Sequence, residues 1–208
     1  MTRERGSFIV LEGGEGGGKS TVLAALAAHL RTSGRGVVET REPGGTTLGE
    51  RIRALILDAR GVDDALAELL LFEAARAHLV ATVIRPALDR GDVVLCDRFS
   101  ASSVAYQAYG RGLPREIVER ANGIATGGLA PDLTLLLDVP VDVGLARRAS
   151  GGDANHFDRE AAAFHERVRQ GFLDLAAQSP GAWCVIDAAQ AEGTVVAAAI
   201  NAVDGTLA

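Results

Sequence analysis

The sequence predicts an α/β fold built on a five-stranded parallel sheet with helices on both faces. Apolar runs of strand length recur along the chain with helical stretches between them, which is typical of such a three-layer arrangement. A glycine-rich turn follows the first run, and the next three also lead into polar stretches. Ligands of parallel sheets collect at the carboxyl ends of the strands. The expected strands are Phe8–Glu12, Val37–Thr40, Val93–Asp97, Leu133–Val139 and Trp183–Asp187.

Composition indicates a globular chain. No tract is rich enough in Gly, Pro or Ser to divide the 208 residues, so we expect one domain, residues 1–208. The longest apolar runs are far shorter than the ~20 residues of a membrane span, and MTRERGSF lacks the apolar segment of an export signal. Two distant cysteines, Cys96 and Cys184, suit a reducing cytoplasm. A net charge of −6 argues against a broad nucleic-acid surface. We therefore expect a cytoplasmic protein without membrane or nucleic-acid partners.

The stretch VLEGGEGGGKST places five glycines within six positions between a strand and an Ala/Leu-rich helix. Gly13, Gly18, Lys19 and Ser20 fit G-x-x-x-x-G-K-[ST], in which backbone N–H groups wrap a phosphate, the lysine reaches it and the hydroxyl binds Mg²⁺. The helix N-terminus adds its positive dipole end. A chance glycine turn is the alternative, but strand, loop and helix stand in the order that phosphate binding requires. The expected phosphate loop comprises Gly13, Gly14, Glu15, Gly16, Gly17, Gly18, Lys19, Ser20 and Thr21.

The segments after the second and third strands carry charged candidates. TREPGGTTLGERIR contains Glu42 and Arg53, and its glycines and arginines suit a phosphorylated substrate, although a plain surface loop explains them equally well. The third strand ends on Asp97, where a protein with a phosphate loop often keeps the carboxylate that manages Mg²⁺. A structural pair between Asp97 and Arg98 is the competing interpretation. Arg98 also offers a planar fork to a phosphate.

Two helical segments offer groups for a flat heterocycle. The apolar period predicts a helix from Asp64 to near Arg85, where Pro86 disturbs it. Phe72 and Arg76 are four residues apart and share a face of this helix. Taken alone, a core phenylalanine and a solvated arginine are the commoner outcome. The stretch SSVAYQ presents further polar groups at helical spacing, although an exposed helix face explains them equally well: Ser102, Ser103, Tyr106 and Gln107.

A lid is expected after the fourth strand. The stretch ASGGDANH has the composition of a mobile loop between two helices. We place the lid at about residues 146–160. It supplies the arginines Arg147, Arg148 and Arg159.

Taken together, several motifs resemble bacterial thymidylate kinases, a nucleoside-monophosphate kinase family of the P-loop NTPase class. The motifs span most of the chain: FIVLEGGEGGGKST, TREPGGTTLGERIR, LLLFEAARAH, VVLCDRFSASSVAYQAYGRG, PDLTLLLDVP and FDREAAAFHERVRQGFLDLA. The resemblance implies transfer of the ATP γ-phosphate to dTMP with Mg²⁺, giving dTDP and ADP in dTTP synthesis. It also implies a homodimer.

The resemblance also implies roles for individual residues. The phosphate loop would bind ATP, with Glu15 near the substrate sugar, while Ser20 and Asp97 would serve the metal. Substrate contacts would come from Glu15, Glu42, Arg53, Phe72, Arg76, Arg98, Ser102, Ser103, Tyr106 and Gln107. Within this set Phe72 would stack on thymine, Arg76 and Gln107 would bind its edge, and Tyr106 would lie near the 2′ carbon. Catalytic roles would fall to Lys19, Asp97, Arg98, Arg147 and Arg148.

The chain departs from this family's pattern at three positions. Gly16 stands where some relatives carry an arginine inside the phosphate loop, so the charge must come from elsewhere. His156 replaces a lid arginine, and imidazole lacks its bidentate fork. Ala75 stands where an acidic residue is common, which we expect to loosen the positioning of Arg76.

Three alternatives compete with this interpretation, and the sequence argues against one of them. A kinase for another nucleotide or small molecule has the same fold. A GTP-dependent switch protein would carry an Asn-Lys-x-Asp motif, and the chain contains no Asn-Lys pair. A nucleotide-binding pseudoenzyme is the third.

Overall fold

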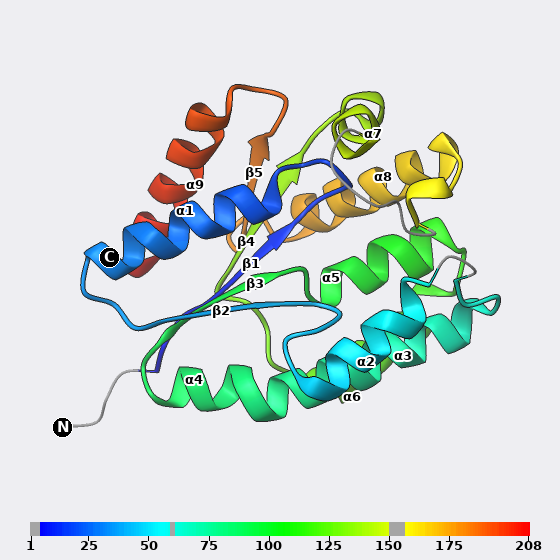
Figure 1. Ribbon diagram of the computed structural model, residues 1–208, viewed down its shortest axis with the longest axis horizontal. Coiled ribbons are helices and arrows are strands. Elements are labelled where there is room, and N and C mark those ends of the chain that lie inside the picture. The colour runs from blue at the N-terminus through cyan, green and yellow to red at the C-terminus, as the bar shows by residue number, and fades with distance from the viewer. Residues whose placement is uncertain (1–4, 59–60, 150–156) are drawn as a thin grey trace.

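The computed structural model describes residues 5–58, 61–149 and 157–208, and its core is the parallel sheet expected from the sequence (Figure 1). The strands lie in the order β2-β3-β1-β4-β5. Their bounds differ from the expected ones by one residue at the ends of β2 and β4. They are β1 (Phe8–Glu12), β2 (Val37–Arg41), β3 (Val93–Asp97), β4 (Leu133–Asp138) and β5 (Trp183–Asp187).

Helices cover both faces of the sheet, as the apolar runs predicted. Alternate residues of a strand point to opposite faces, so Ile9 packs in the cluster with helices α1 and α9, while Val10 packs in the cluster with η1 and α4. Figure 1 shows α1 and α9 together on one side of the sheet. The helical elements are α1 (Lys19–Thr32), α2 (Thr47–Ile56), α3 (Ala65–Leu79), η1 (Val80–Ile84), α4 (Arg85–Asp89), α5 (Ser100–Ser103), η2 (Val104–Gly110), α6 (Arg115–Thr126), α7 (Val141–Ala149), η3 (Phe157–Arg159), α8 (Ala162–Gln178) and α9 (Glu192–Leu207).

The register brings the chemistry to one edge of the sheet. Central β1 pairs with β3 and β4, and Leu11 lies opposite Asp97 while Glu12 lies opposite Leu136. The phosphate loop after β1 and the loop after β3 therefore start side by side. None of the helices in the described segments is both long enough and apolar enough to span a bilayer.

The helix is disturbed just before Pro86, as expected, but its path continues beyond Arg85, which corrects the expected end. A π-helical turn, η1, precedes Pro86, which occupies the start of α4. Proline lacks an N–H and cannot join the i→i−4 ladder, and a π-helical turn is a common way to accommodate such a break. The helical path therefore runs on to Asp89.

The phosphate loop and α7 touch backbone to backbone at two glycines. A Cβ on Gly16, whose φ is +69°, would lie 2.0 Å from the carbonyl oxygen of Gly144. A Cβ on Gly144 would in turn lie 2.4 Å from the carbonyl oxygen of Glu15. A side chain at position 16 is thus excluded by the helix that carries Arg147 and Arg148, which gives a steric reason for the missing loop arginine.

We expect Gly16→Ala to destabilise the protein by about 2 kcal/mol, because the new methyl group meets backbone at a left-handed φ. The melting temperature should fall by about 5 °C for a chain of this size, and ATP affinity should weaken with it. Gly14→Ala is the matched control, since a Cβ there has no heavy atom within 4 Å. Calorimetric melts of both variants that coincide with wild type would contradict the steric argument.

Candidate active site

The phosphate loop has the geometry of an anion site. Gly18, in the left-handed region with φ 82°, forms the N-cap of α1, so the helix begins at Lys19. The ammonium group of Lys19 donates to the carbonyl oxygens of Gly13 at 3.1 Å and Gly14 at 2.9 Å, which folds its side chain across the loop. Burial, with the nearby charge of Arg98, lowers the pKa of Lys19. A phosphate in the loop would offer this buried cation an ionic partner.

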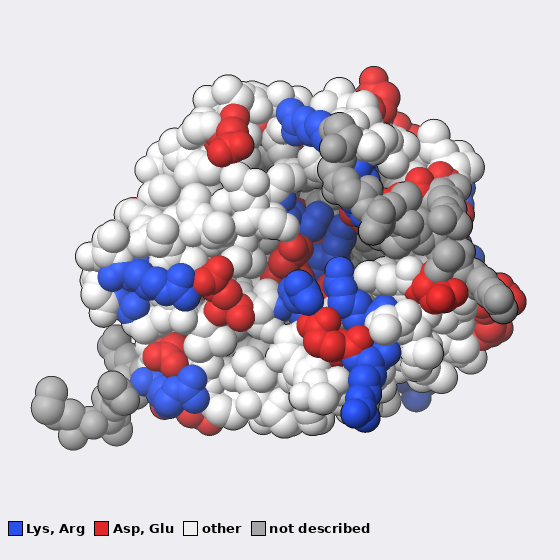
Figure 2. Space-filling model, in the orientation of Figure 1, with Lys and Arg blue, Asp and Glu red and all other residues white. Residues whose placement is uncertain are grey.

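A basic cavity opens beside the loop. Figure 2 shows Lys and Arg side chains gathered around a hollow near the middle of this face. Six cationic side chains and three carboxylates line it: Lys19, Arg41, Arg53, Arg98, Arg147 and Arg148 with Glu15, Glu42 and Asp97. The excess of cations suits a polyanionic ligand.

Ser20 and Asp97 fit a magnesium ion in this cavity. Both side chains line it, and Oδ1 of Asp97 is buried without a hydrogen-bond partner in the described structure. Mg²⁺ in nucleotide sites takes one or two protein oxygens and completes its shell with water and phosphate oxygens. A lone hydroxyl and a lone carboxylate therefore suffice. No cluster of three or more His, Cys, Asp or Glu ligands occurs among the described residues.

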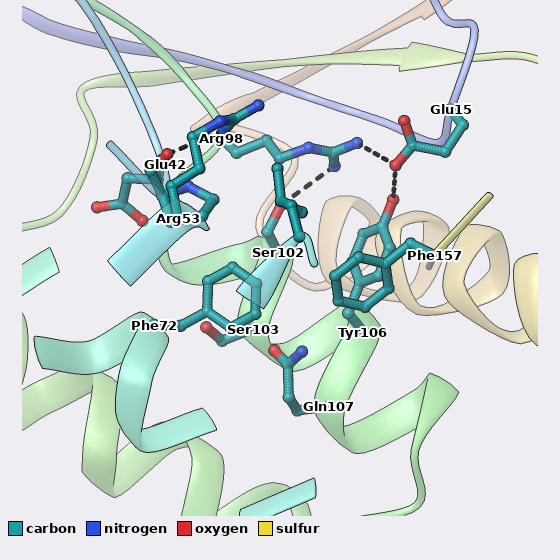
Figure 3. A pocket seen from close by; sticks show the side chains of 12 residues that line it. Glu15, Glu42, Arg53, Phe72, Arg98, Ser102, Ser103, Tyr106, Gln107 and Phe157 are labelled. Carbon is teal, nitrogen blue, oxygen red and sulfur yellow. Dashed lines mark hydrogen bonds and ion pairs between the residues drawn. The ribbon is translucent and has the colours of Figure 1, made fainter. Parts of the chain in front are cut away.

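A second, aromatic pocket adjoins the basic cavity (Figure 3). Nine of the ten substrate residues expected from the sequence line it, and Arg76 does not. Its lining is Glu15, Glu42, Pro43, Arg53, Leu57, Phe72, Arg98, Ser102, Ser103, Tyr106, Gln107 and Phe157.

Four side chains line both spaces: Glu15, Glu42, Arg53 and Arg98. They mark the place where the basic cavity meets the aromatic pocket. Arg53 donates to the carbonyl oxygen of Pro43 at 2.9 Å, which fixes it at this boundary. Its helix, α2, is capped by Thr46, whose hydroxyl accepts from the N–H of Gly49.

Arg98 joins the loops after β1 and β3. Its φ of 71° is unusual for a non-glycine residue, and it aims the guanidinium back at the phosphate loop. There it donates to the carbonyl oxygen of Gly13 and to Glu15, each at 2.9 Å. Tyr106 donates to the same Glu15 oxygen at 2.9 Å (Figure 3). Burial opposes the charge of Glu15, but Arg98 and Lys19 outweigh it and lower its pKa to about 2.

Glu12 fixes the loop after β3 by accepting hydrogen bonds from it. This fully buried carboxylate accepts from the backbone N–H groups of Phe99 at 2.9 Å and Ser102 at 3.2 Å, and from the Ser102 hydroxyl at 2.6 Å. Burial raises its pKa, although Arg98 and these hydrogen bonds work against that rise. Glu12 was not singled out from the sequence, because a strand-end glutamate has no distinctive spacing.

Arg76 lies behind the wall of the aromatic pocket, with 1% of its surface exposed. Each nitrogen of its guanidinium already has an acceptor: Glu42 binds Nε at 2.7 Å, Asn122 binds Nη1 at 2.7 Å, and the Phe99 carbonyl binds Nη2 at 3.2 Å. Glu73 and Ser103 also accept from Nη1. The expected contact of Arg76 with a base edge therefore stays a prediction, and in this structure the residue organises the wall.

Contrary to expectation, Arg76 is not loosened by Ala75, because Glu73 supplies an acidic partner for it. It lies one turn before Arg76 on α3 and is buried with it. One guanidinium thus serves two buried carboxylates, Glu42 and Glu73, and each carboxylate keeps one buried oxygen without a partner in the described structure. Burial raises the pKa of Glu42 to about 7, although Arg76 pulls in the opposite direction.

The arginines of α7 differ in their partners. Arg147 donates to the carbonyl oxygen of Ala188 at 2.7 Å and also lines a cleft between the phosphate loop and the start of α9. Arg148 pairs with Asp158 of η3 at 3.1 Å. His156 and the side chain of Arg159 lie outside the described residues, as does much of the expected lid.

Phe157 was also missed from the sequence. Its ring lies 6.4 Å from that of Phe72, centroid to centroid, on the side of the pocket that η3 covers. Its position beside the lid arginines was the available signal. Asn122 of α6, which binds Arg76, could not have been recognised from the sequence, because an asparagine within an amphipathic helix is commonly exposed.

The family model for thymidylate kinase matches residues 11–199 of this chain. The chain belongs to the thymidylate kinase family. A thymidylate kinase of Thermosynechococcus vestitus is 53% identical over 196 residues, which cover 89% of this chain and 81% of that protein. One of Deinococcus radiodurans is 50% identical over 188 residues, covering 90% and 91%. A crystal structure of thymidylate kinase from Ehrlichia chaffeensis matches with a TM-score of 0.78 at 34% identity, covering 96% of this chain and 99% of that one.

These matches confirm the thymidylate kinase family and the P-loop NTPase fold that the motifs predicted. They also support the main functional interpretation over the alternatives, because the curated relatives share about half of the residues along most of the chain. The roles of individual side chains remain predictions, for which the geometry above supplies the physical setting.

We expect Glu42→Gln to change how the stability of this thymidylate kinase depends on pH. Between its ordinary pKa of 4.5 and about 7, the folded chain keeps a proton on Glu42 that the unfolded chain releases. The free energy of unfolding of wild type should therefore fall as pH rises through this window, by about 3 kcal/mol. The variant should lack this part of the slope. Urea unfolding of both chains across the window measures it, and parallel pH profiles would refute it.

Proposed function

We propose that this chain transfers the γ-phosphoryl group of ATP to dTMP, giving dTDP and ADP in dTTP synthesis, and that residues 1–208 work as one domain. Family membership supports the kinase activity and the substrate. The single observation that carries the assignment to this site is the shared boundary between the basic cavity and the aromatic pocket, formed by Glu15, Glu42, Arg53 and Arg98.

The boundary suits an in-line transfer between two phosphates. Phosphoryl transfer depends on positioning and charge stabilisation more than on covalent help. The phosphate loop and Lys19 would hold the donor, while Arg53 and Arg98 would hold the acceptor phosphate where the two spaces meet. The attacking phosphate oxygen is ionised near neutral pH, so no strong general base is required. When bound at Ser20 and Asp97, Mg²⁺ would neutralise charge on the β and γ phosphates.

The two arginines of α7 would have different roles in binding ATP and in stabilising the transferred phosphoryl group. Arg147, tied to Ala188 beside the start of α9, would bind the nucleoside side of ATP as well as its phosphates. Arg148 lines the basic cavity and would reach the moving phosphoryl group after leaving Asp158. Because a side chain at position 16 is sterically excluded, α7 is the nearest source of this charge.

The aromatic pocket would hold the nucleoside of dTMP. Phe72 offers its face to the base, and Gln107 offers an amide at the far end of the pocket (Figure 3). Tyr106, fixed by its hydrogen bond to Glu15, would crowd a 2′ hydroxyl.

The test is a coupled ADP-release assay with ATP, Mg²⁺ and one monophosphate at a time: dTMP, dUMP, UMP, CMP, AMP or GMP. We expect the highest kcat/KM with dTMP, at least about 10-fold above the ribonucleotides because a contact that excludes one small group discriminates by about that factor. Chelating the metal with EDTA should abolish turnover. A folded protein that turns over another monophosphate faster would refute the substrate, and one that turns over none would indicate a pseudoenzyme.

We further propose a homodimer. Leu66 and Leu70 lie one turn apart on α3 and are exposed, and neighbouring α6 exposes Ile117 and Ile124. Apolar side chains grouped on adjacent helices are typical of protein interfaces. The proposed location is the cytoplasm, where the thiols of Cys96 and Cys184, both free in this structure, stay reduced.

Sedimentation velocity tests the dimer. Wild type should sediment at about twice the chain mass of 21.6 kDa. Leu70→Glu should shift it toward the monomer, because a charge at the centre of an apolar interface is costly to bury. Val185→Glu is the control, since Val185 is about equally exposed but lies on strand β5. A monomeric wild type, or equal behaviour of both variants, would count against this interface.

A further inference from the structure

Gln107, at the far end of the aromatic pocket, is held from behind by a buried carboxylate. Its Nε2 donates to Oε1 of Glu68 at 2.9 Å. Glu68 has no exposed surface and Gln107 has 1%, so water does not compete for this hydrogen bond. In Figure 3 the amide of Gln107 points into the space between Phe72 and Tyr106. No described residue donates to its Oε1.

The carboxylate fixes which way round the amide lies. An amide side chain has a donor end and an acceptor end that are nearly equal in shape. A carboxylate only accepts hydrogen bonds. Glu68 therefore selects the orientation in which the NH₂ group of Gln107 faces the protein and the carbonyl oxygen is left for a ligand. The reverse orientation would place two acceptors against each other in a buried site, which is costly.

Arg111 binds the same carboxylate from another side. The guanidinium contacts both oxygens of Glu68, at 3.3 Å and 3.2 Å, and also pairs with Glu160. It lies 5.5 Å from the ring centroid of Phe157, the aromatic residue of η3 that lines the pocket. The chain of contacts therefore runs from the η3 side of the pocket through Arg111 and Glu68 to Gln107.

We propose that Glu68 is a positioning residue that sets base specificity by presenting the carbonyl oxygen of Gln107 to a ring N–H. The inference rests on the proposed use of this pocket for a pyrimidine monophosphate. Thymine carries a hydrogen on N3 and donates there. Cytosine has a lone pair at N3 and an amino group at C4, so its N3 would face the carbonyl oxygen as a second acceptor. Glu68 thereby favours thymine without touching it.

The sharpest comparison uses dTMP and 5-methyl-dCMP, which differ only at this edge of the base. In the variant Glu68→Gln, Arg111 would hold the oxygen of the new amide, and its NH₂ group would face Gln107. Gln107 is then free to turn its own NH₂ group toward the ligand. We expect the ratio of kcat/KM for dTMP to that for 5-methyl-dCMP to fall at least about 10-fold, the cost of one mispaired polar contact. KM should carry the change, with kcat for dTMP largely kept.

Two variants separate this positioning role from a general loss of order in the pocket. Glu160→Gln weakens the other ion pair of Arg111 but leaves the contact between Glu68 and Gln107, so the ratio should stay within about 2-fold of wild type. Glu68→Asp keeps an accepting carboxylate, and the order of preference should survive even where overall affinity falls. An unchanged ratio in folded Glu68→Gln, or an equal fall in Glu160→Gln, would overturn the proposal.

A measurement on the wild-type protein covers the case in which Glu68→Gln does not fold. With dTMP labelled with ¹⁵N at N3, the complex should show a hydrogen-bonded imino proton by NMR, and Gln107→Met should lose it. An imino proton that exchanges freely in the wild-type complex would overturn the proposal. The proposed function fails separately, when folded wild type turns over neither compound.

Discussion

The site depends on the guanidinium of Arg98, which ties the glycine loop after β1 to the pocket after β3. Its contacts with Gly13 and Glu15 cross between neighbouring strand ends, and its backbone adopts a left-handed φ to reach them. Such a conformation costs about 1 kcal/mol or more and persists only where the surroundings fix it. Here Glu12 fixes it, because one buried carboxylate binds the N–H groups that follow Arg98. The basic cavity and the aromatic pocket therefore share a wall whose geometry is set by contacts within the protein.

Buried carboxylates lie behind three polar parts of the site. Glu12 lies behind the loop after β3, Glu73 behind Arg76, and Glu68 behind Gln107. A buried charge is costly unless it is paired and hydrogen-bonded, so each of these groups also restricts its partner to one arrangement. The polar groups in the wall of the pocket are therefore held in fixed orientations. Its rim gains charge from Arg53 and Arg98, which stay partly accessible to a phosphate.

The sheet and the phosphate loop were predicted because both follow from local patterns, whereas the residues of the aromatic pocket were implied by the family resemblance. Strand-length apolar runs give the sheet, and the G-x-x-x-x-G-K-[ST] spacing gives the phosphate loop. The position of Arg76 did not follow, since spacing from Phe72 defines a shared helix face but not the acceptors on α6 and in the loop after β2 that draw the guanidinium inward. Steric exclusion at Gly16 was equally invisible, because the clash comes from α7, more than a hundred residues away. The path of the helix through Pro86 depended on a π-helical turn that has no clear sequence pattern.

Specificity in such a pocket depends on whether a hydrogen-bond donor or an acceptor faces the base, as well as on which groups make contact. In the proposed function Phe72 would stack on any flat ring, so it would treat thymine and 5-methylcytosine almost alike. The difference between these bases is the reversal of a donor and an acceptor, and only a group of fixed polarity can detect it. A glutamine alone has no fixed polarity, since its amide can turn over. A glutamine against an ion-paired carboxylate has one, and the carboxylate that confers it is further stabilised by Arg111, the same arginine that packs against Phe157. In the proposed readout, the polarity that recognises the base and the aromatic cover of the pocket therefore involve the same cation, Arg111.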